Sequence, residues 1–184
     1  MFILKSNSPR RMQILENLGL RFQVESSNAN EDQFQNENHL HYLERMVYSK
    51  LGQNIKEDAL YLTADTIVVY QGEILHKPTD EADAKRILSL LSAKTHSVFS
   101  GICLATMETK EFFYEETRIQ FKTWGSSEIE MYIKKYQPYD KAGSYGIQDE
   151  AGPVLERVGS YSNVLGFPLR SFLQQIELWK QFTN

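Results

Sequence analysis

One acidic residue, Asp65, stands in a stretch that is otherwise typical of a buried β-strand. Residues 59–70 read ALYLTADTIVVY, and this density of aliphatic and aromatic side chains indicates a strand covered on both faces. Removing an unpaired carboxylate from water costs several kcal/mol. We therefore expect Asp65 to bind a cation or to act as a base, with a structural ion pair or backbone hydrogen bonds as the alternative.

Groups suited to phosphate occur near the N-terminus and at the end of an expected helix. The run SPRR at residues 8–11 places a hydroxyl, backbone N–H groups and two guanidinium groups at a helix start, where the helix dipole favours an anion. The alternative is an ordinary N-cap with surface arginines, and lysines are usually solvent-facing. The phosphate-binding candidates are Ser8, Arg10, Arg11 and Lys50.

A second carboxylate, Glu31, lies in the polar, asparagine-rich segment 26–38. Two carboxylates with phosphate oxygens and water suit Mg²⁺, Mn²⁺ or Co²⁺, and such ions seldom need an all-protein cage. Asp65 and Glu31 are therefore the candidate metal ligands, although a charged residue in a polar loop is most often only hydrated. Lys77 is held extended before Pro78, just past the Asp65 strand, and joins both acids as a candidate catalytic residue.

The glycine-rich run 141–152 offers groups that could recognise a nucleobase. Lys141 precedes an Ala-Gly pair, where the backbone can approach a ligand closely, and Gln148 supplies an amide of the kind that reads a base edge. Gln148 and Lys141 are the base-binding candidates. The alternative for this run is an ordinary tight turn.

Size and composition fit one globular domain spanning residues 1–184. The net charge is −4, which does not favour a nucleic acid polymer as the main partner. Apolar runs fall far short of the ~20 residues of a membrane span, and the N-terminus lacks a secretory pattern, so no membrane partner is expected. A single cysteine, Cys103, cannot form a disulfide within the chain, which favours a cytoplasmic location.

Hydrophobic periodicity predicts a mixed α/β fold. The expected strands are residues 2–6, 21–25, 59–70, 73–75, 96–107, 111–124 and 154–158. The expected helices are residues 9–18, 39–51, 80–92 with Thr79 as its cap, 127–136 with a capping box of Ser127 and Glu130, and 168–182 with Phe172, Ile176 and Trp179 facing the core.

Five blocks of sequence carry a family resemblance. They read SNSPRR at 6–11, ADTIVV at 64–69, ILHKP at 74–78, DKAGSYGIQ at 140–148 and GSYSNVLGFPL at 159–169. In this order, over nearly the whole chain, they resemble the signatures of the Maf family of nucleotide pyrophosphatases. The SPRR and DKAGSYGIQ forms are similar to the branch that acts on dTTP and UTP.

The resemblance implies an inosine-triphosphatase-like (Maf/Ham) fold, with a mixed twisted sheet, helices and two lobes around a deep cleft. It implies metal-dependent hydrolysis of dTTP, UTP and modified pyrimidine nucleotides to the monophosphate and pyrophosphate, often by a homodimer. The family's functional positions correspond to Ser8, Arg10, Arg11, Glu31, Lys50, Asp65, Lys77 and Gln148.

Two other functions remain open at this point. One is hydrolysis of inosine or other non-standard purine triphosphates, and the other is nucleotide binding without turnover by a division regulator. The chain also departs from the family pattern, because His76 and Asp149 stand where glycine is usual. Asp149 adds negative charge beside the presumed base pocket, which bears on substrate preference.

Overall fold

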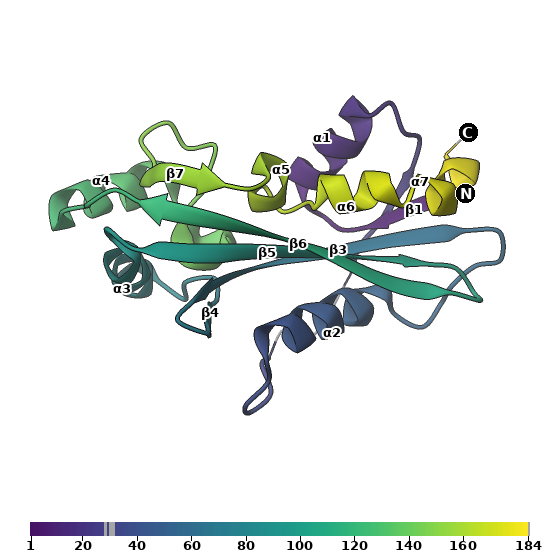
Figure 1. Ribbon diagram of the computed structural model, residues 1–184, viewed down its shortest axis with the longest axis horizontal. Coiled ribbons are helices and arrows are strands. Elements are labelled where there is room, and N and C mark those ends of the chain that lie inside the picture. The colour runs from purple at the N-terminus through teal and green to yellow at the C-terminus, as the bar shows by residue number, and fades with distance from the viewer. Residues whose placement is uncertain (28, 30–31, 184) are drawn as a thin grey trace. The chain divides into compact units, whose positions relative to one another are not determined.

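A computed structural model describes residues 1–27, 29 and 32–183 (Figure 1). The strands are β1 (Phe2–Lys5), β2 (Gln23–Glu25), β3 (Leu60–Tyr70), β4 (Glu73–Leu75), β5 (Thr95–Ala105), β6 (Lys110–Phe121) and β7 (Val154–Val158). The helices are α1 (Pro9–Asn17), α2 (His39–Leu51), α3 (Glu81–Leu91), α4 (Ser126–Tyr136), α5 (Tyr161–Val164), α6 (Leu169–Gln174) and α7 (Ile176–Trp179), with 3₁₀ turns at Pro138–Asp140, Ala142–Ser144 and Lys180–Phe182.

The described strands form one mixed sheet of seven strands. Its order is β2-β1-β3-β5-β6-β7, and β4 pairs with β3. β1 is parallel to both β2 and β3, whereas the β3–β4 and β6–β7 pairs are antiparallel. The expected mixed α/β class is confirmed.

The chain divides into two compact units. The first comprises residues 1–65, 100–115 and 166–184, and the second comprises residues 66–99 and 116–165. Strands β3, β5 and β6 contribute residues to both units.

In the first unit, the two faces of β3 are covered by different helices. Tyr61 faces α2 and belongs to a buried cluster with Val47, and Thr63 donates a hydrogen bond of 2.6 Å to the carbonyl of Val47. Leu60 and Leu62 point to the other face, where the core includes side chains of α1 and α6 (Figure 1). Because side chains alternate along a strand, the next position on the α2 side after Thr63 is Asp65.

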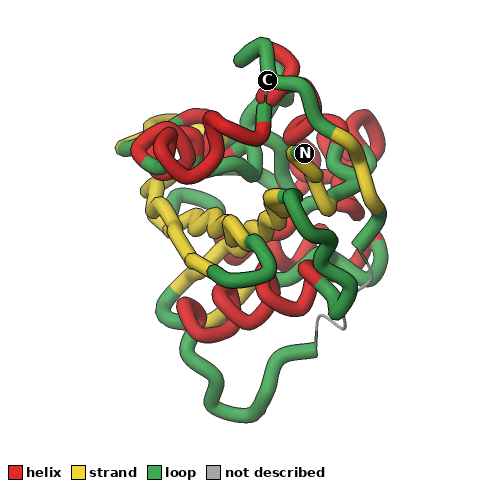
Figure 2. Tube along the Cα trace, turned by 90° about the vertical axis from the view of Figure 1, so that its right-hand side faces the viewer, coloured by secondary structure: helices red, strands yellow, loops and turns green. Residues whose placement is uncertain are grey.

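Residues 32–38, the described end of the polar segment before α2, contain no helix or strand, and Figure 2 shows this stretch leading into α2. The loop ends at Asn38, whose side chain accepts a hydrogen bond from the Leu40 N–H and caps the helix. The helix then ends at Gly52, which has a φ of 74°, so both bounds agree with the expected helix 39–51.

In the second unit, α3 and α4 pack together through apolar faces. Ala84, Ile87, Leu88 and Leu91 of α3 are all buried, and they share a cluster with Ile129, Tyr132 and Ile133 of α4. An ion pair between Lys85 and Glu130 joins the exposed sides of the two helices.

The starts of these two helices differ from the prediction. Asp80, and not Thr79, caps α3 by accepting from the Asp83 N–H at 2.8 Å. In α4 the carboxylate of Glu128 accepts from the Gly125 N–H at 2.9 Å, so the expected box of Ser127 and Glu130 is wrong. In both helices a nearby carboxylate supplies the acceptor for the exposed N–H groups.

The expected C-terminal helix 168–182 is also wrong, because it breaks at Gln175. The Trp179 indole donates a 2.8 Å hydrogen bond to the carbonyl of Phe172, and the two rings stack with centroids 4.7 Å apart. This carbonyl would accept from the N–H of Ile176 in a continuous helix. Phe172 and Trp179 are buried as expected, but Ile176 is 44% exposed.

Three further observations complete the fold. Strand β2 is shorter than expected, and the short helix α5, capped by Ser160, was not expected. Cys103 is a free, buried thiol. Among the described residues, no helix combines the length and the apolar character needed to cross a bilayer.

Candidate functional site

Asp65 lies in the middle of β3 and is paired with the end of α2. The Lys50 ammonium donates to the Oδ1 atom of Asp65, and both side chains are largely buried, with exposed fractions of 11% and 14%. The pairing follows from α2 covering the face of β3 on which Thr63 and Asp65 lie. It brings together two of the predicted residues, a carboxylate and a cation, and leaves part of the carboxylate accessible.

The start of α1 is placed near the same end of β1 and β3. The two strands are parallel, and Lys5 pairs with Thr63, two residues before Asp65. The chain that follows β1 therefore leaves the sheet at the end of the two strands that is nearer to Asp65. Ser8 occupies the N-cap position with Pro9 as the first helical residue, as predicted, but the Ser8 side chain makes no capping hydrogen bond among the described residues.

The two arginines of this turn differ in their surroundings. The Arg11 guanidinium donates to the Gly166 carbonyl at 2.9 Å and to the Ser6 hydroxyl at 3.1 Å, so it ties the turn to the segment before α6. Arg10 is half-buried in the first turn of the helix. A phosphate at this helix start would meet backbone N–H groups together with guanidinium groups.

The remaining described candidates belong to the second unit. Lys77 is exposed and follows β4, whereas Lys141 is mostly buried and pairs with Asp140 at 2.9 Å. Gln148 is exposed in the turn formed by residues 146–149. The structure therefore shows Lys141 engaged with its neighbour and Gln148 presented at the surface of its unit.

Two anchors hold the turn that carries Gln148, and sequence reasoning did not identify them. On one side, the Tyr132 hydroxyl donates to the carboxylate of Asp149, which also accepts from the Gly146 N–H at 3.1 Å. Burial and the hydrogen bond to Asp149 raise the pKa of Tyr132, so this hydroxyl keeps its proton. The only sequence signal was the unusual acid at position 149.

On the other side, Tyr145 is buried against His96. The Tyr145 hydroxyl lies 2.9 Å from Nε2 of His96, and both rings pack edge-on against Phe121. Burial lowers the pKa of His96 to about 4 and raises the pKa of Tyr145, so both groups are neutral near pH 7. Nδ1 of His96 and the Ser144 hydroxyl have no hydrogen-bond partner among the described residues.

The expected metal site is defined only in part. Glu31 lies outside the described residues, and among those described no group of three His, Cys, Asp or Glu side chains is arranged to hold a metal. A partly accessible carboxylate at Asp65 fits an ion that takes its other ligands from phosphate and water.

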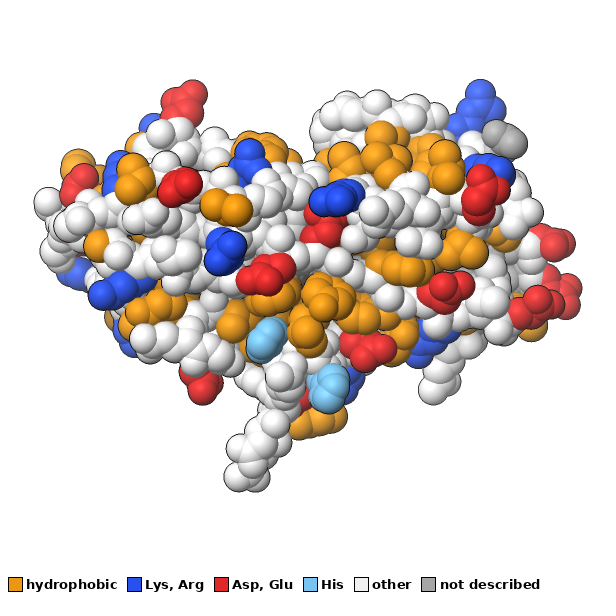
Figure 3. All heavy atoms as spheres, in the orientation of Figure 1, with side chains coloured by type: hydrophobic (Ala, Val, Ile, Leu, Met, Phe, Trp, Pro, Cys, Tyr) orange, Lys and Arg blue, Asp and Glu red, His pale blue; other side chains and the backbone are white. Residues whose placement is uncertain are grey.

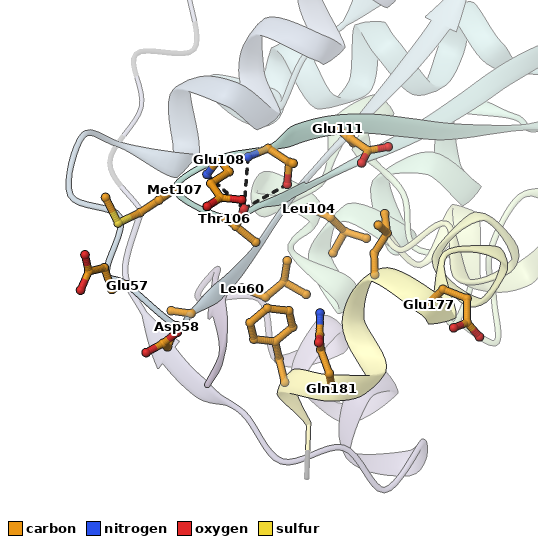
Figure 4. Close-up of a pocket in the computed structure, with 14 residues that line it drawn as sticks. Glu57, Asp58, Leu60, Leu104, Thr106, Met107, Glu108, Glu111, Glu177 and Gln181 are labelled. Carbon is orange, nitrogen blue, oxygen red and sulfur yellow. Dashed lines mark hydrogen bonds between the residues drawn. The ribbon is translucent and has the colours of Figure 1, made fainter.

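The first unit also contains an open groove of about 690 Å³ at a different place (Figure 4). Leu60 and Leu104 line it, and no lysine or arginine lines it among the residues that the structure describes. Five carboxylates line it, namely Glu57, Asp58, Glu108, Glu111 and Glu177. Several acidic side chains also gather at the right-hand edge of Figure 3, where Figure 1 shows the loop before β3 and the turn between β5 and β6. Like charges repel, so this groove is not suited to a triphosphate.

Comparisons with known proteins agree with the sequence blocks and the fold. The family model described as "Maf-like protein" matches residues 1–179. A dTTP/UTP pyrophosphatase of Leptospira biflexa is 58% identical, covering 97% of this chain and 94% of the relative. A dTTP/UTP pyrophosphatase of Leptospira interrogans is 46% identical, covering 99% of this chain and 97% of the relative. One of Thermotoga maritima is 38% identical, covering 97% of this chain and 90% of the relative. The chain therefore belongs to the Maf family.

Proposed function

We propose that this protein is a nucleoside triphosphate pyrophosphatase that acts on dTTP and UTP and releases pyrophosphate. The activity named for relatives at 38–58% identity over nearly the full length supports the substrate class. The observation that carries the chemistry is the pair formed by Lys50 and Asp65, which places a carboxylate and a cation together in an otherwise apolar strand.

The reaction that suits these residues is attack of water on the α-phosphorus. The new bond joins the water oxygen to the α-phosphorus, the bond to the bridging oxygen breaks, and pyrophosphate leaves with the electron pair. In this proposal the carboxylate of Asp65 orients the water and accepts its proton. Without a covalent intermediate, catalysis depends on positioning and on charge stabilisation.

The cations of the chain would bind the triphosphate and offset its charge. Arg10 and the N–H groups at the start of α1 suit one phosphate, while Lys50 lies against Asp65 and suits another. Arg11 has a hydrogen-bonding role within the fold as well, because it holds the carbonyl of Gly166. Ser8 and Lys77 are proposed to complete the phosphate contacts.

A divalent metal held by Asp65 and Glu31 would supply charge neutralisation on the phosphate oxygens. Gln148 and Lys141 are proposed to bind the base. We further propose one functional domain over residues 1–184, with two lobes around a cleft, acting as a homodimer. A cytoplasmic location is in keeping with the free thiol of Cys103.

A nucleotide panel tests the activity directly. Pyrophosphate release is measured from dTTP, UTP, 5-methyl-CTP, 7-methyl-GTP and ITP with Mg²⁺, Mn²⁺ or Co²⁺, and the products are separated to distinguish monophosphate from diphosphate. We expect dTTP and UTP to give the highest kcat/KM and the monophosphate as product. A preference for ITP would instead identify a purine house-cleaning enzyme, and tight binding without pyrophosphate release would identify a nucleotide sensor.

A further inference from the structure

Asp149 is half-buried, and its carboxylate is hydrogen-bonded within its own unit. Its Oδ2 atom accepts from the Tyr132 hydroxyl and from the Gly146 N–H at 3.1 Å, and Tyr132 in turn accepts from the same N–H at 3.0 Å. The backbone closes the same turn, because the Asp149 N–H donates to the Gly146 carbonyl at 3.2 Å. The three residues thus form a closed hydrogen-bonded group, which we call the Asp149 clamp.

The Asp149 clamp also occupies the space beside Gly146, so a side chain there would have to displace the Asp149 carboxylate. A Cβ atom at Gly146 would lie 2.7 Å from Oδ2 of Asp149, far closer than such atoms approach in proteins. The clamp is also joined to a rigid support, since the Tyr132 ring packs between those of Trp124 and Tyr136 with centroids 5.0 and 4.9 Å away. The turn is therefore fixed to α4 and to the buried aromatic cluster.

Gln148 lies inside the turn that the clamp closes. It is exposed, whereas Tyr145 before the turn is buried and bonded to His96, so the turn is anchored on both flanks. An exposed amide can recognise a base selectively only if the backbone beneath it has one orientation, because each alternative orientation lowers the population that can bind.

We propose that Asp149 is a positioning residue for base recognition: through Tyr132 and Gly146 it holds the turn that presents Gln148, and so it sets the selectivity for the pyrimidine base. This proposal rests on the function proposed above. In this proposal Asp149 acts as a hydrogen-bond acceptor that fixes the turn, and not as a negative charge beside the base. The hydrogen bonds of the clamp, and not its charge, carry the effect.

Four variants separate geometry from charge. Asp149→Ala removes the acceptor, and Tyr132→Phe removes the donor while keeping the ring. Asp149→Asn keeps an acceptor oxygen but removes the charge. Glu150→Gln removes the neighbouring exposed charge and serves as the matched control. Steady-state kinetics are measured for UTP, dTTP and CTP, and circular dichroism and thermal melting confirm that each variant is folded.

The expected result is a change in KM with kcat nearly preserved. For Asp149→Ala we expect KM for UTP to rise about tenfold, kcat to stay within about twofold, and the UTP-to-CTP ratio of kcat/KM to fall about tenfold. In Tyr132→Phe, KM for UTP should rise and the UTP-to-CTP ratio of kcat/KM should fall, each by about threefold. In Asp149→Asn and Glu150→Gln, both quantities should stay within about twofold of the parent protein.

Several outcomes would overturn the proposal. An equal loss of kcat for all three nucleotides in Asp149→Ala would mean a structural role only, and a changed selectivity in Asp149→Asn or Glu150→Gln would mean that charge decides. If Asp149→Ala fails to fold, Tyr132→Phe and Asp149→Asn still decide between these readings. A parent protein that releases no pyrophosphate would refute the proposed function itself, whereas an active parent with unchanged Asp149→Ala refutes only this inference.

Discussion

The ammonium of Lys50, at the end of α2, donates to the carboxylate of Asp65 in the middle of β3. Both side chains are nearly enclosed, so the ion pair lies in surroundings of low polarity. Such a pair is costly to break on one side only, because the remaining charge stays buried without its partner. The same pair therefore matters for stability and for the proposed chemistry.

Asp65→Asn should keep the fold, although with a lower free energy of unfolding because Lys50 loses the carboxylate beside it, and should lower kcat by about 10²- to 10⁴-fold, since the amide cannot accept the proton of water. Pyrophosphate release from dTTP, followed beside a thermal melt, checks this. Asp58→Asn is a suitable control, because Asp58 is exposed in the same unit. Near-parental turnover in Asp65→Asn would remove this carboxylate from the mechanism.

A double-mutant cycle measures the coupling between Lys50 and Asp65. We expect Lys50→Met to lower the free energy of unfolding more than Lys50→Met combined with Asp65→Asn, with a coupling of about 1 to 3 kcal/mol. Urea unfolding gives the four values. The exposed pair of Lys56 and Glu25 is the control, and its coupling should be clearly smaller, because water screens the two charges. Equal coupling in the two pairs would contradict the enclosed character of the first.

His96 should make the stability depend on pH. Burial lowers its pKa from 6.5 to about 4, so the unfolded chain binds more protons than the folded chain between these values. The stabilisation is therefore complete above about pH 6.5 and is lost as the pH falls toward 4, by up to about 3 kcal/mol. Urea unfolding of the parent at pH 7 and pH 5 measures the slope. The slope should diminish in His96→Gln and persist in His41→Gln, where the exposed histidine of α2 is replaced.

Cys103 should be unreactive in the folded protein. Burial raises the pKa of its thiol to about 12, and only the thiolate reacts readily with disulfide reagents. A colorimetric disulfide reagent at pH 8 should therefore detect the thiol only after denaturant is added. Met107→Cys, which places a second thiol at an exposed position, is the positive control. Rapid labelling of the folded parent chain would show that the strand opens more easily than its burial implies.

Gly143→Ala should destabilise the protein by about 3 kcal/mol, because a side chain is disfavoured at its φ of 69° and the new Cβ would lie 2.9 Å from a methyl of Val68. Gly19→Ala separates the two causes. Gly19 has a similar φ of 73° but open space around it, so its replacement should cost about 1 kcal/mol. Equal losses in thermal or urea unfolding would mean that the packing against Val68 has little effect.

Periodic patterns predicted the elements that lie against the core. The helix 39–51 and the strand around Asp65 have the expected bounds, within a residue, because apolar spacing and terminal glycine or asparagine report local geometry. The enclosed setting of Asp65 was also expected from its apolar neighbours, and the ion pair was among the alternatives. Which cation meets the carboxylate depends on how α2 lies on β3, and spacing in the chain does not encode this.

Other features depend on contacts between distant residues. At the break at Gln175, the Phe172 carbonyl accepts from the Trp179 indole and from the Gln175 N–H, and periodicity does not reveal these contacts. The hydrogen bond of the Asp149 carboxylate similarly requires the Tyr132 hydroxyl of α4. Glu31, the proposed second metal ligand, lies outside the described residues and stays a prediction.

The first unit is built from segments that lie far apart in the sequence, and this restricts when it can form during translation. Phe2 of β1 stacks on Phe172, and the core around them draws on residues from both ends of the sequence. On the ribosome, this core therefore cannot form around the first 65 residues until the stretch from Gly166 onward has been synthesised. The second unit is encoded between these segments, so its residues emerge in full before the first unit can be completed.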